Sequence, residues 1–292
     1  MKDTSPFFIL SSGRSGSQMF QKLFCLYDAV EMHHEYLCNH IQPLAVKYYL
    51  GLVTKDQAKK ELSKQYEAAI YYSDRVMWGD SSNKLSWLIE PLNELFPNAK
   101  FIHIIRDGRK VVSSFYNKLR DECYDDKSTK TLQLWVDNPE KYIEPPHEKK
   151  YWWNVENKKS INYKQFINYN QFQRICYHWH TVNSTIENDF IEINEGRKIV
   201  FRLEDLVTKK SKLKHMLKFL GLKYREEVFD LLKTPHNVNV PKDFLLNMNQ
   251  IDQFNAIAGE TMKKYGYNKN REYKMNYKGS TSITYSREDK KC

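Results

Sequence analysis

Two short segments of this chain carry the residue types that bind anions. The first reads Ser11-Ser12-Gly13-Arg14-Ser15-Gly16-Ser17-Gln18 and follows an apolar run at residues 6–10. A buried strand, a loop of glycines and hydroxyl residues and then a helix start form an arrangement that binds phosphate-like groups. Backbone N–H groups and the helix N-terminus converge there on one oxyanion. The residues expected to hold that anion are Gly13, Arg14, Ser15, Gly16, Ser17 and Gln18.

This loop differs from the P-loop of nucleoside triphosphatases. That motif ends in Gly-Lys-Ser/Thr, and its lysine and hydroxyl serve the phosphates and a magnesium ion. Here Gly13 precedes Arg14 and Gly16 precedes Ser17, so the Gly-Lys pair is missing. We therefore expect the anion to be held without magnesium, and we expect no metal site.

The second segment, residues 100–116, has an apolar strand that ends in Arg106, a turn at Asp107-Gly108 and a helix opening at Arg109. A residue at the carboxyl end of a strand faces the crevice where open α/β sheets bind ligands. Ser114 follows eight residues later, on a helix face that can return toward the crevice. An arginine fork and a hydroxyl would make a second anion clamp. The alternative is an ordinary Arg–Asp pair at a surface turn.

Together the two segments resemble the sulfotransferases that use 3′-phosphoadenosine 5′-phosphosulfate (PAPS). The 5′-phosphosulfate loop of that family reads Arg/Lys-Ser-Gly-Thr/Ser, which residues 14–17 match, and its 3′-phosphate motif reads Arg-Asp-Pro-Arg-Asp-x-x-x-Ser, which residues 106–114 match. The spacing from Arg to Ser is kept. Gly108 stands where Pro is common and Lys110 where Asp is common, and neither change removes a ligand group.

Three further stretches look like bacterial-type members of the family. They are the Gly-Asp-Ser-Ser-Asn run at 79–83, the Glu-Asp-Leu and Phe-Leu-Gly motifs within 201–222, and the closing stretch at 262–267. The resemblance thus covers about residues 6–267 but does not include residues 120–162.

The resemblance implies a P-loop-like fold, PAPS as co-substrate without a metal, and sulfuryl transfer by in-line displacement to a hydroxyl or amine. The acceptor would be a carbohydrate or another small molecule. Gly13 to Gln18 would bind the 5′-phosphosulfate, and Arg106 and Ser114 the 3′-phosphate. Arg14 would stabilise the leaving phosphate by charge and hydrogen bonding. It would not act as a general acid, because the pKa of arginine stays above about 12.

The acceptor should also need a general base. The candidates His33, His34 and Glu35 lie at the end of the second predicted strand, and Asp80 at the end of the third is their rival. Strand alternation places His33 and Glu35 on one face and His34 on the other. A packed or surface histidine pair without a catalytic role is the alternative.

These motifs require a sheet that places them at one edge. Predicted strands at 7–10, 30–34, 76–79, 100–106 and 198–203 alternate with predicted helices. Short apolar strands of this kind indicate a mostly parallel sheet with helices on both faces, a three-layer α/β fold. We expect one domain over residues 1–292.

Two regions depart from this alternation of strands and helices. Residues 120–162 combine prolines with several tryptophans and tyrosines, and a substrate-facing cap is one interpretation of them. A surface excursion with locally packed tryptophans is the other. From about residue 271 the chain lacks periodicity, and a C-terminal tail is expected.

Composition limits the remaining function classes. The net charge of +10 suggests an anionic partner, but the lysines lie in dispersed pairs without a nucleic-acid-binding spacing, so no nucleic acid is expected. No apolar stretch approaches the roughly 18 residues of a membrane span, and a cytoplasmic location is expected. The remaining alternatives are a P-loop-related kinase and a non-catalytic polyanion-binding module.

Overall fold

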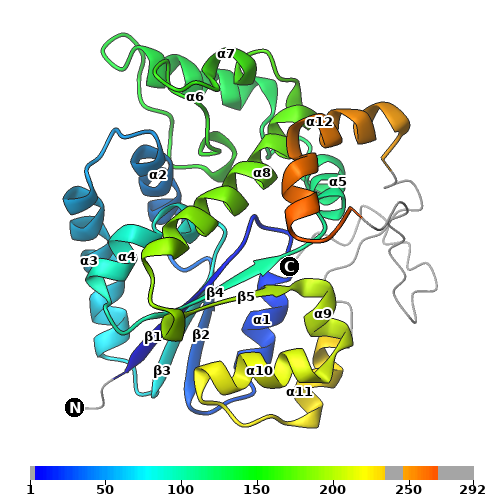
Figure 1. Ribbon diagram of the computed structural model, residues 1–292. Coiled ribbons are helices and arrows are strands. Elements are labelled where there is room, and N and C mark those ends of the chain that lie inside the picture. Colours follow the sequence, from blue (N-terminus) through cyan, green and yellow to red (C-terminus); the bar gives the residue numbers. More distant parts are fainter. Residues whose placement is uncertain (1–3, 234–245, 269–292) are drawn as a thin grey trace, which may run out of the picture.

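One parallel sheet forms the centre of the protein (Figure 1). The computed structural model describes residues 4–233 and 246–268. The strands follow the order β2-β3-β1-β4-β5, and every neighbouring pair is parallel. Their bounds are β1 Ser5–Leu10, β2 Val30–His34, β3 Met77–Ser81, β4 Lys100–Ile105 and β5 Lys198–Arg202. The α/β fold with a central parallel sheet, predicted from the sequence, is confirmed.

Helices cover both faces of this sheet. The α-helices are α1 Ser17–Phe24, α2 Cys38–Tyr49, α3 Lys55–Tyr71, α4 Ile89–Leu95, α5 Gly108–Lys118, α6 Asp126–Asp137, α7 Tyr163–Phe166, α8 Gln171–Asp189, α9 Leu203–Thr208, α10 Lys210–Leu220, α11 Glu226–Lys233 and α12 Met248–Lys264. Short 3₁₀ turns are η1 Lys84–Trp87, η2 Lys149–Tyr151, η3 Phe190–Glu192 and η4 Glu195–Arg197.

The two faces of β1 pack into different hydrophobic clusters. Phe7 and Ile9 pack with side chains of α1, α9, α10 and α11. Phe8 and Leu10 pack instead with side chains of α2, α3, α4 and the end of α8. All four are at most 2% exposed. Because successive side chains of a strand point to opposite faces, a strand that is apolar throughout must be covered on both sides.

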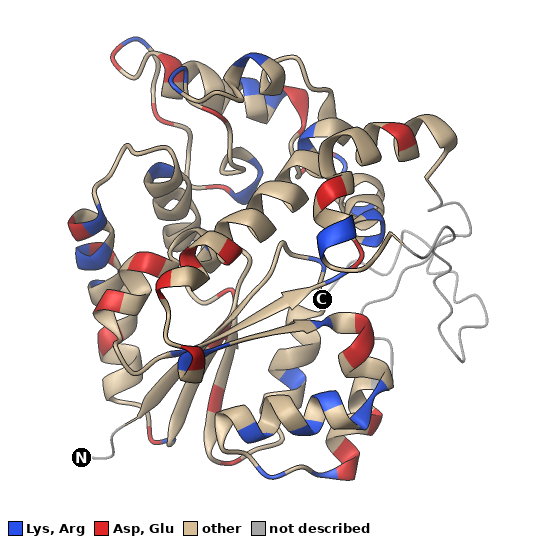
Figure 2. Cartoon of the chain, viewed as in Figure 1, with Lys and Arg blue, Asp and Glu red and all other residues tan. Residues whose placement is uncertain are grey.

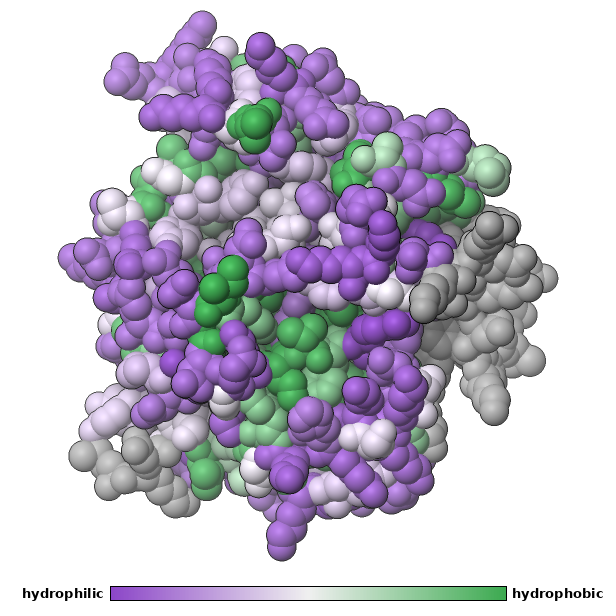
Figure 3. All heavy atoms as spheres, in the orientation of Figure 1, coloured by the Kyte–Doolittle hydropathy of each residue, from purple (hydrophilic) through white to green (hydrophobic). Residues whose placement is uncertain are grey.

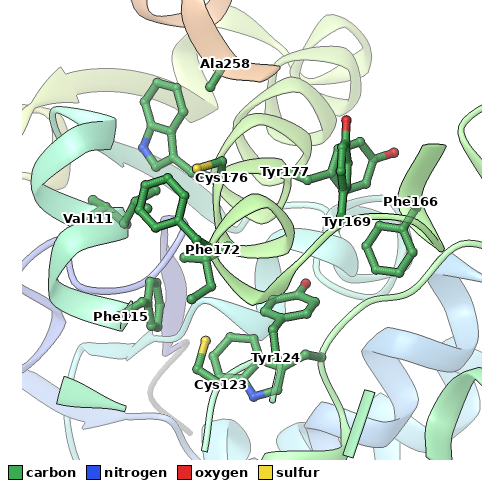
Figure 4. Packing of buried hydrophobic residues seen from close by; sticks show 14 of the residues in the cluster. Val111, Phe115, Cys123, Tyr124, Phe166, Tyr169, Phe172, Cys176, Tyr177 and Ala258 are labelled. Atoms are coloured by element: carbon green, nitrogen blue, oxygen red, sulfur yellow. The ribbon is translucent and has the colours of Figure 1, made fainter. Parts of the chain in front are cut away.

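A third cluster lies beyond the carboxyl ends of the strands. In it α5, α8 and α12 meet the segment at residues 120–162, as Figure 4 shows for Phe115, Tyr124, Cys176 and Ala258. Trp152 and Trp153 of that segment are at most 2% exposed. The two tryptophans therefore pack in the core of the protein rather than on the surface of an excursion.

The surface shows no single basic face in the view of Figure 2, where basic and acidic residues are both scattered over the chain. An apolar area lies near the middle of the same view, over β5 (Figure 3), and Val200 of that strand is 47% exposed. Within residues 4–233 and 246–268, no helix combines the length and apolar character of a membrane span. The expected tail from residue 271 lies outside the described residues.

Candidate functional site

The loop between β1 and α1 has the backbone conformation of an anion cradle. Gly13, Arg14 and Gly16 all adopt left-handed conformations, with φ of +84°, +53° and +86°. Left-handed residues in such a loop turn backbone N–H groups toward one concave side. At Gly13 a Cβ atom would also lie 2.8 Å from Cζ of Phe115, so only glycine fits there. Gly16 is the N-cap of α1, which places the helix N-terminus at the same loop.

Buried hydrogen bonds fix the start of this loop. The backbone N–H of Ser11 and the side chain of Ser86 are 3.2 Å apart, and that hydroxyl donates in turn to the carbonyl of Ser11 at 3.1 Å. His178 of α8 contacts the carbonyl of Ser12 through Nε2 at 3.0 Å and the hydroxyl of Tyr124 through Nδ1 at 3.1 Å. Burial lowers the pKa of His178 to about 3, so the ring is neutral and supports the loop without adding charge.

The two anion motifs predicted from the sequence meet in space. Nε of Arg14 donates to Oγ of Ser114 at 3.0 Å, and Nη1 of Arg106 donates to the carbonyl of Arg14 at 2.6 Å. The two guanidinium groups therefore lie together at the carboxyl edge of the sheet, the position at which open α/β sheets have their ligand crevice. Burial and then the charge of Arg106 lower the pKa of Arg14. Like charges this close repel each other, and a bound anion would relieve that repulsion.

Lys118 is a third cation of this crevice that the sequence analysis missed. Burial lowers its pKa to about 8, and the charges of Arg14 and Arg106 act in the same direction. A signal was available, because Lys118 follows Ser114 by four residues and such pairs share one face of a helix.

The turn after β4 is held by its own side chains and by α8. Asp107 caps α5 by accepting from the N–H of Arg109 at 3.0 Å, and it pairs with the guanidinium of Arg109 at 2.7 Å. A Cβ at Gly108 would lie 2.8 Å from the ring of Trp179. The glycine that replaces the family's proline is thus explained by the close approach of this tryptophan.

The candidate bases lie in different surroundings. Nε2 of His34 is 2.8 Å from Oγ of Ser17, on the face of the sheet that α1 covers. His33 points to the other face, where Nε2 lies 2.8 Å from Glu31 and the ring packs on Trp78. His34 is therefore the histidine that contacts the anion loop, and burial lowers its pKa so that the neutral form is favoured.

Glu35 follows directly after β2 and has a left-handed backbone, with φ of +54°. Both of its carboxylate oxygens accept from Nζ of Lys149, at 2.8 and 3.2 Å. Burial disfavours ionisation of Glu35, but the ammonium of Lys149 outweighs it and the pKa is lowered on balance. Glu35 is thus an ionised carboxylate, and its charge also reaches Arg14.

Asp80 is enclosed in the protein. Its carboxylate accepts from the N–H of Tyr36 at 3.2 Å and from the hydroxyl of Tyr66 at 2.9 Å, and the residue is fully buried. Burial raises its pKa to about 6. The end of β3 therefore does not present Asp80 to the crevice surface, because α3 and the residues after β2 cover it.

Lys84 is a further cation near Glu35 that no motif indicated. It is 2% exposed, its Nζ donates to the carbonyl of Trp152 at 2.8 Å, and the ammonium lies 4.3 Å from the ring centroid of Trp153. Burial and then the charge of Lys149 lower its pKa to about 7. In the part of the chain that the structure describes, no three His, Cys, Asp or Glu side chains are grouped as metal ligands would be.

The fold and the paired anion motifs define a P-loop-like α/β protein with a cationic crevice at the carboxyl edge of its sheet. The model of the sulfotransferase family matches residues 6–144, which contain the anion loop, Arg106 and Ser114. This match and the fold support a sulfotransferase-family assignment for the chain.

Solved structures with a similar fold include three sulfotransferases. Sulfotransferase STF9 from Mycobacterium avium is 12% identical, with 90% of this chain and 77% of that chain covered and a TM-score of 0.51. The sulfotransferase domain from the curacin biosynthetic pathway is 14% identical, with 89% and 98% covered and a TM-score of 0.48. A sulfotransferase from Alicyclobacillus acidocaldarius is 10% identical, with 87% and 96% covered and a TM-score of 0.44. A search of curated proteins found no match.

Proposed function

We propose that this protein transfers a sulfuryl group from PAPS to a hydroxyl or amine of a carbohydrate or another small molecule. The observation that carries the proposal is the contact between two anion motifs about a hundred residues apart, through Nε of Arg14 and Oγ of Ser114. A nucleotide with anions on both its 3′ and 5′ positions would satisfy both motifs, whereas a single phosphate needs only one.

In this proposal the β1–α1 loop binds the 5′-phosphosulfate, and Arg106 and Ser114 bind the 3′-phosphate. Lys118 adds a third cation on the same side. The acceptor oxygen attacks sulfur in line, a new O–S bond forms, and the bond from sulfur to the bridging oxygen breaks. Negative charge develops on that oxygen of the departing 3′,5′-ADP, where Arg14 supplies charge and hydrogen-bond donors.

The proton of the acceptor goes to a base on the opposite side of the sulfur. Glu35 is the base we assign, because it is ionised and its charge reaches Arg14. His34 is second, since its contact with Ser17 ties it to the donor loop. His33 and Asp80 are less suited, because each is bound to groups outside the crevice.

The binding part of this proposal is tested with 3′,5′-ADP and an Arg106→Ala variant. Loss of a charge-assisted contact should weaken binding by about tenfold to a hundredfold. Titration calorimetry measures the change. Arg75→Ala is the control, because Arg75 precedes β3 at the opposite end of the sheet, where its guanidinium donates to the carbonyl of Asp28. Equal affinity of the Arg106 variant and the wild type would overturn the assignment, as would tighter, magnesium-dependent binding of ATP.

A further inference from the structure

An ion pair closes the acceptor side of the crevice. Nζ of Lys149 donates to both carboxylate oxygens of Glu35, the group that the proposed function assigns as base. The side chains are 40% and 21% exposed, so the pair lies at the surface of the crevice rather than in the core. A carboxylate that already accepts from an ammonium through both oxygens has fewer lone pairs for an incoming proton.

The backbone under Lys149 is fixed, whereas its side chain is not enclosed. The amide of Gln42 donates to the carbonyl of Lys149 at 3.0 Å and to that of Trp152 at 3.2 Å. Trp152 also accepts from Lys84. Movement of Lys149 away from Glu35 therefore needs only a change of side-chain rotamer, with the rest of the 120–162 segment in place.

Charged and titratable groups from several elements surround this pair. The titratable groups whose charges act on Glu35, Lys149 or their neighbours come from several elements: Lys84 of η1, Arg14 of the anion loop, His34 of β2, Asp80 of β3 and Cys38 of α2. Asp80 is enclosed, so Glu35 is the carboxylate of this group that faces the crevice. If Lys149 left it for a neutral acceptor, its ammonium would lose a partner without gaining one.

We propose that Lys149 recognises an anionic substituent on the acceptor, so that the preferred acceptor carries a carboxylate, phosphate or sulfate close to the hydroxyl that is sulfated. The anion takes Lys149 from Glu35, and the released carboxylate accepts the hydroxyl proton as the O–S bond forms. This inference rests on the proposed function and assigns Lys149 a part in acceptor specificity.

Matched acceptors test the inference. We compare 4-nitrophenyl β-D-glucuronide with its C6 amide, and 4-hydroxybenzoate with 4-hydroxybenzamide, because each pair keeps the same hydroxyl groups and differs chiefly in one negative charge. The wild type should prefer the anionic member by about tenfold in kcat/KM, and Lys149→Gln should abolish that preference. Lys150→Gln is the control, because Lys150 pairs with Glu148 at 3.0 Å instead of Glu35. An equal preference for both members in the wild type, or a preference that survives Lys149→Gln, would overturn the inference.

A pH profile separates specificity from a loss of structure. Without its ammonium partner the pKa of Glu35 should rise, so the acid limb of kcat/KM for a neutral acceptor should move to higher pH in Lys149→Gln and stay in place in Lys150→Gln. An unmoved acid limb in Lys149→Gln contradicts the role.

Binding of the same acceptor pairs, measured by NMR without any donor, judges the inference independently of turnover. If the anionic member of each pair binds more tightly and this difference depends on Lys149, the role of Lys149 is supported. A failure of 3′,5′-ADP to bind would then defeat the proposed function but not this role. Equal binding of both members of each pair defeats the inference, even when 3′,5′-ADP binds.

Discussion

The proposed donor side and the proposed acceptor side of the crevice are built in opposite ways. On the donor side, one loop supplies the 5′ anion cradle and one strand–turn–helix supplies the second clamp, so each half is nearly continuous in sequence. On the acceptor side, Glu35 meets Lys149 and Lys84 meets Trp152, and both pairs are far apart along the chain. Local geometry therefore builds the donor side, while the packing of the 120–162 segment builds the acceptor side.

The difference extends to protonation. On the donor side arginines dominate, and they remain charged at any ordinary pH. On the acceptor side burial and neighbouring charges bring the pKa of Lys84 to about 7 and lower that of Glu35. Changes of pH near 7 should thus act through Lys84 on the acceptor side, and changes near 8 through Lys118 on the donor side.

The largest expected effect comes from Glu35→Gln, which keeps the shape of the side chain and removes its basicity. We expect turnover with labelled PAPS to fall by about 10²–10⁴-fold, the usual contribution of a general base, with affinity for 3′,5′-ADP unchanged. Asp80→Asn is the matched control: it should lower the free energy of unfolding by about 1–3 kcal/mol and leave turnover nearly intact. The reverse pattern would make Asp80 the base.

The next largest loss of turnover is expected from Arg14→Ala. Removal of a donor that stabilises developing charge lowers kcat by about 10²–10³-fold, and single-turnover kinetics with excess enzyme measures this step directly. Because Arg14 also donates to Ser114, Ser114→Ala sets an upper limit on the loss that comes from that contact, since the variant also removes the hydroxyl assigned to the 3′-phosphate. If the Arg14 variant loses affinity for 3′,5′-ADP but keeps its single-turnover rate, the catalytic role on the donor side is wrong.

The smallest effect is expected from Lys84→Met. It is a change in how the free energy of unfolding depends on pH. Unfolded lysine keeps its proton to above pH 10, whereas folded Lys84 loses it near pH 7. Between these values the unfolded state binds more protons, so the contribution of Lys84 to the free energy of unfolding rises with pH, by up to about 1.4 kcal/mol per pH unit. Urea unfolding at pH 7, 8 and 9 measures the difference in the free energy of unfolding between Lys84→Met and the wild type. Any excess stability of the variant should shrink as pH rises. A difference that is constant with pH would mean that Lys84 does not titrate in this range.

The sequence predicted the sheet well, and the structure brings the two anion motifs together as expected, for a physical reason. Apolar strands buried on both faces leave a clear pattern, and glycines with left-handed backbones leave another at Gly13 and Gly16. Arg106 and Ser114 could be brought to the same edge because parallel strands end together.

The acceptor side could not be predicted in the same way. Nothing local links Glu35 to Lys149, and no pattern shows that Lys84 would be buried under Trp153. Strand alternation separated His33 from His34, but it does not extend to Glu35, which follows the end of β2 with a left-handed backbone. It also gave no way to choose between the two histidines, because the choice depends on the contact of His34 with Ser17. These relations exist only once the 120–162 segment and α1 have packed.

Calorimetric titration of the wild type with 3′,5′-ADP and with 5′-AMP, each with and without magnesium, tests the central claim most directly. The two nucleotides differ by the 3′-phosphate that the Arg106–Ser114 clamp is assigned to bind. We predict that 3′,5′-ADP binds at least about tenfold more tightly, with or without magnesium. Equal affinity for the two nucleotides, or binding that requires magnesium, would contradict a two-anion clamp.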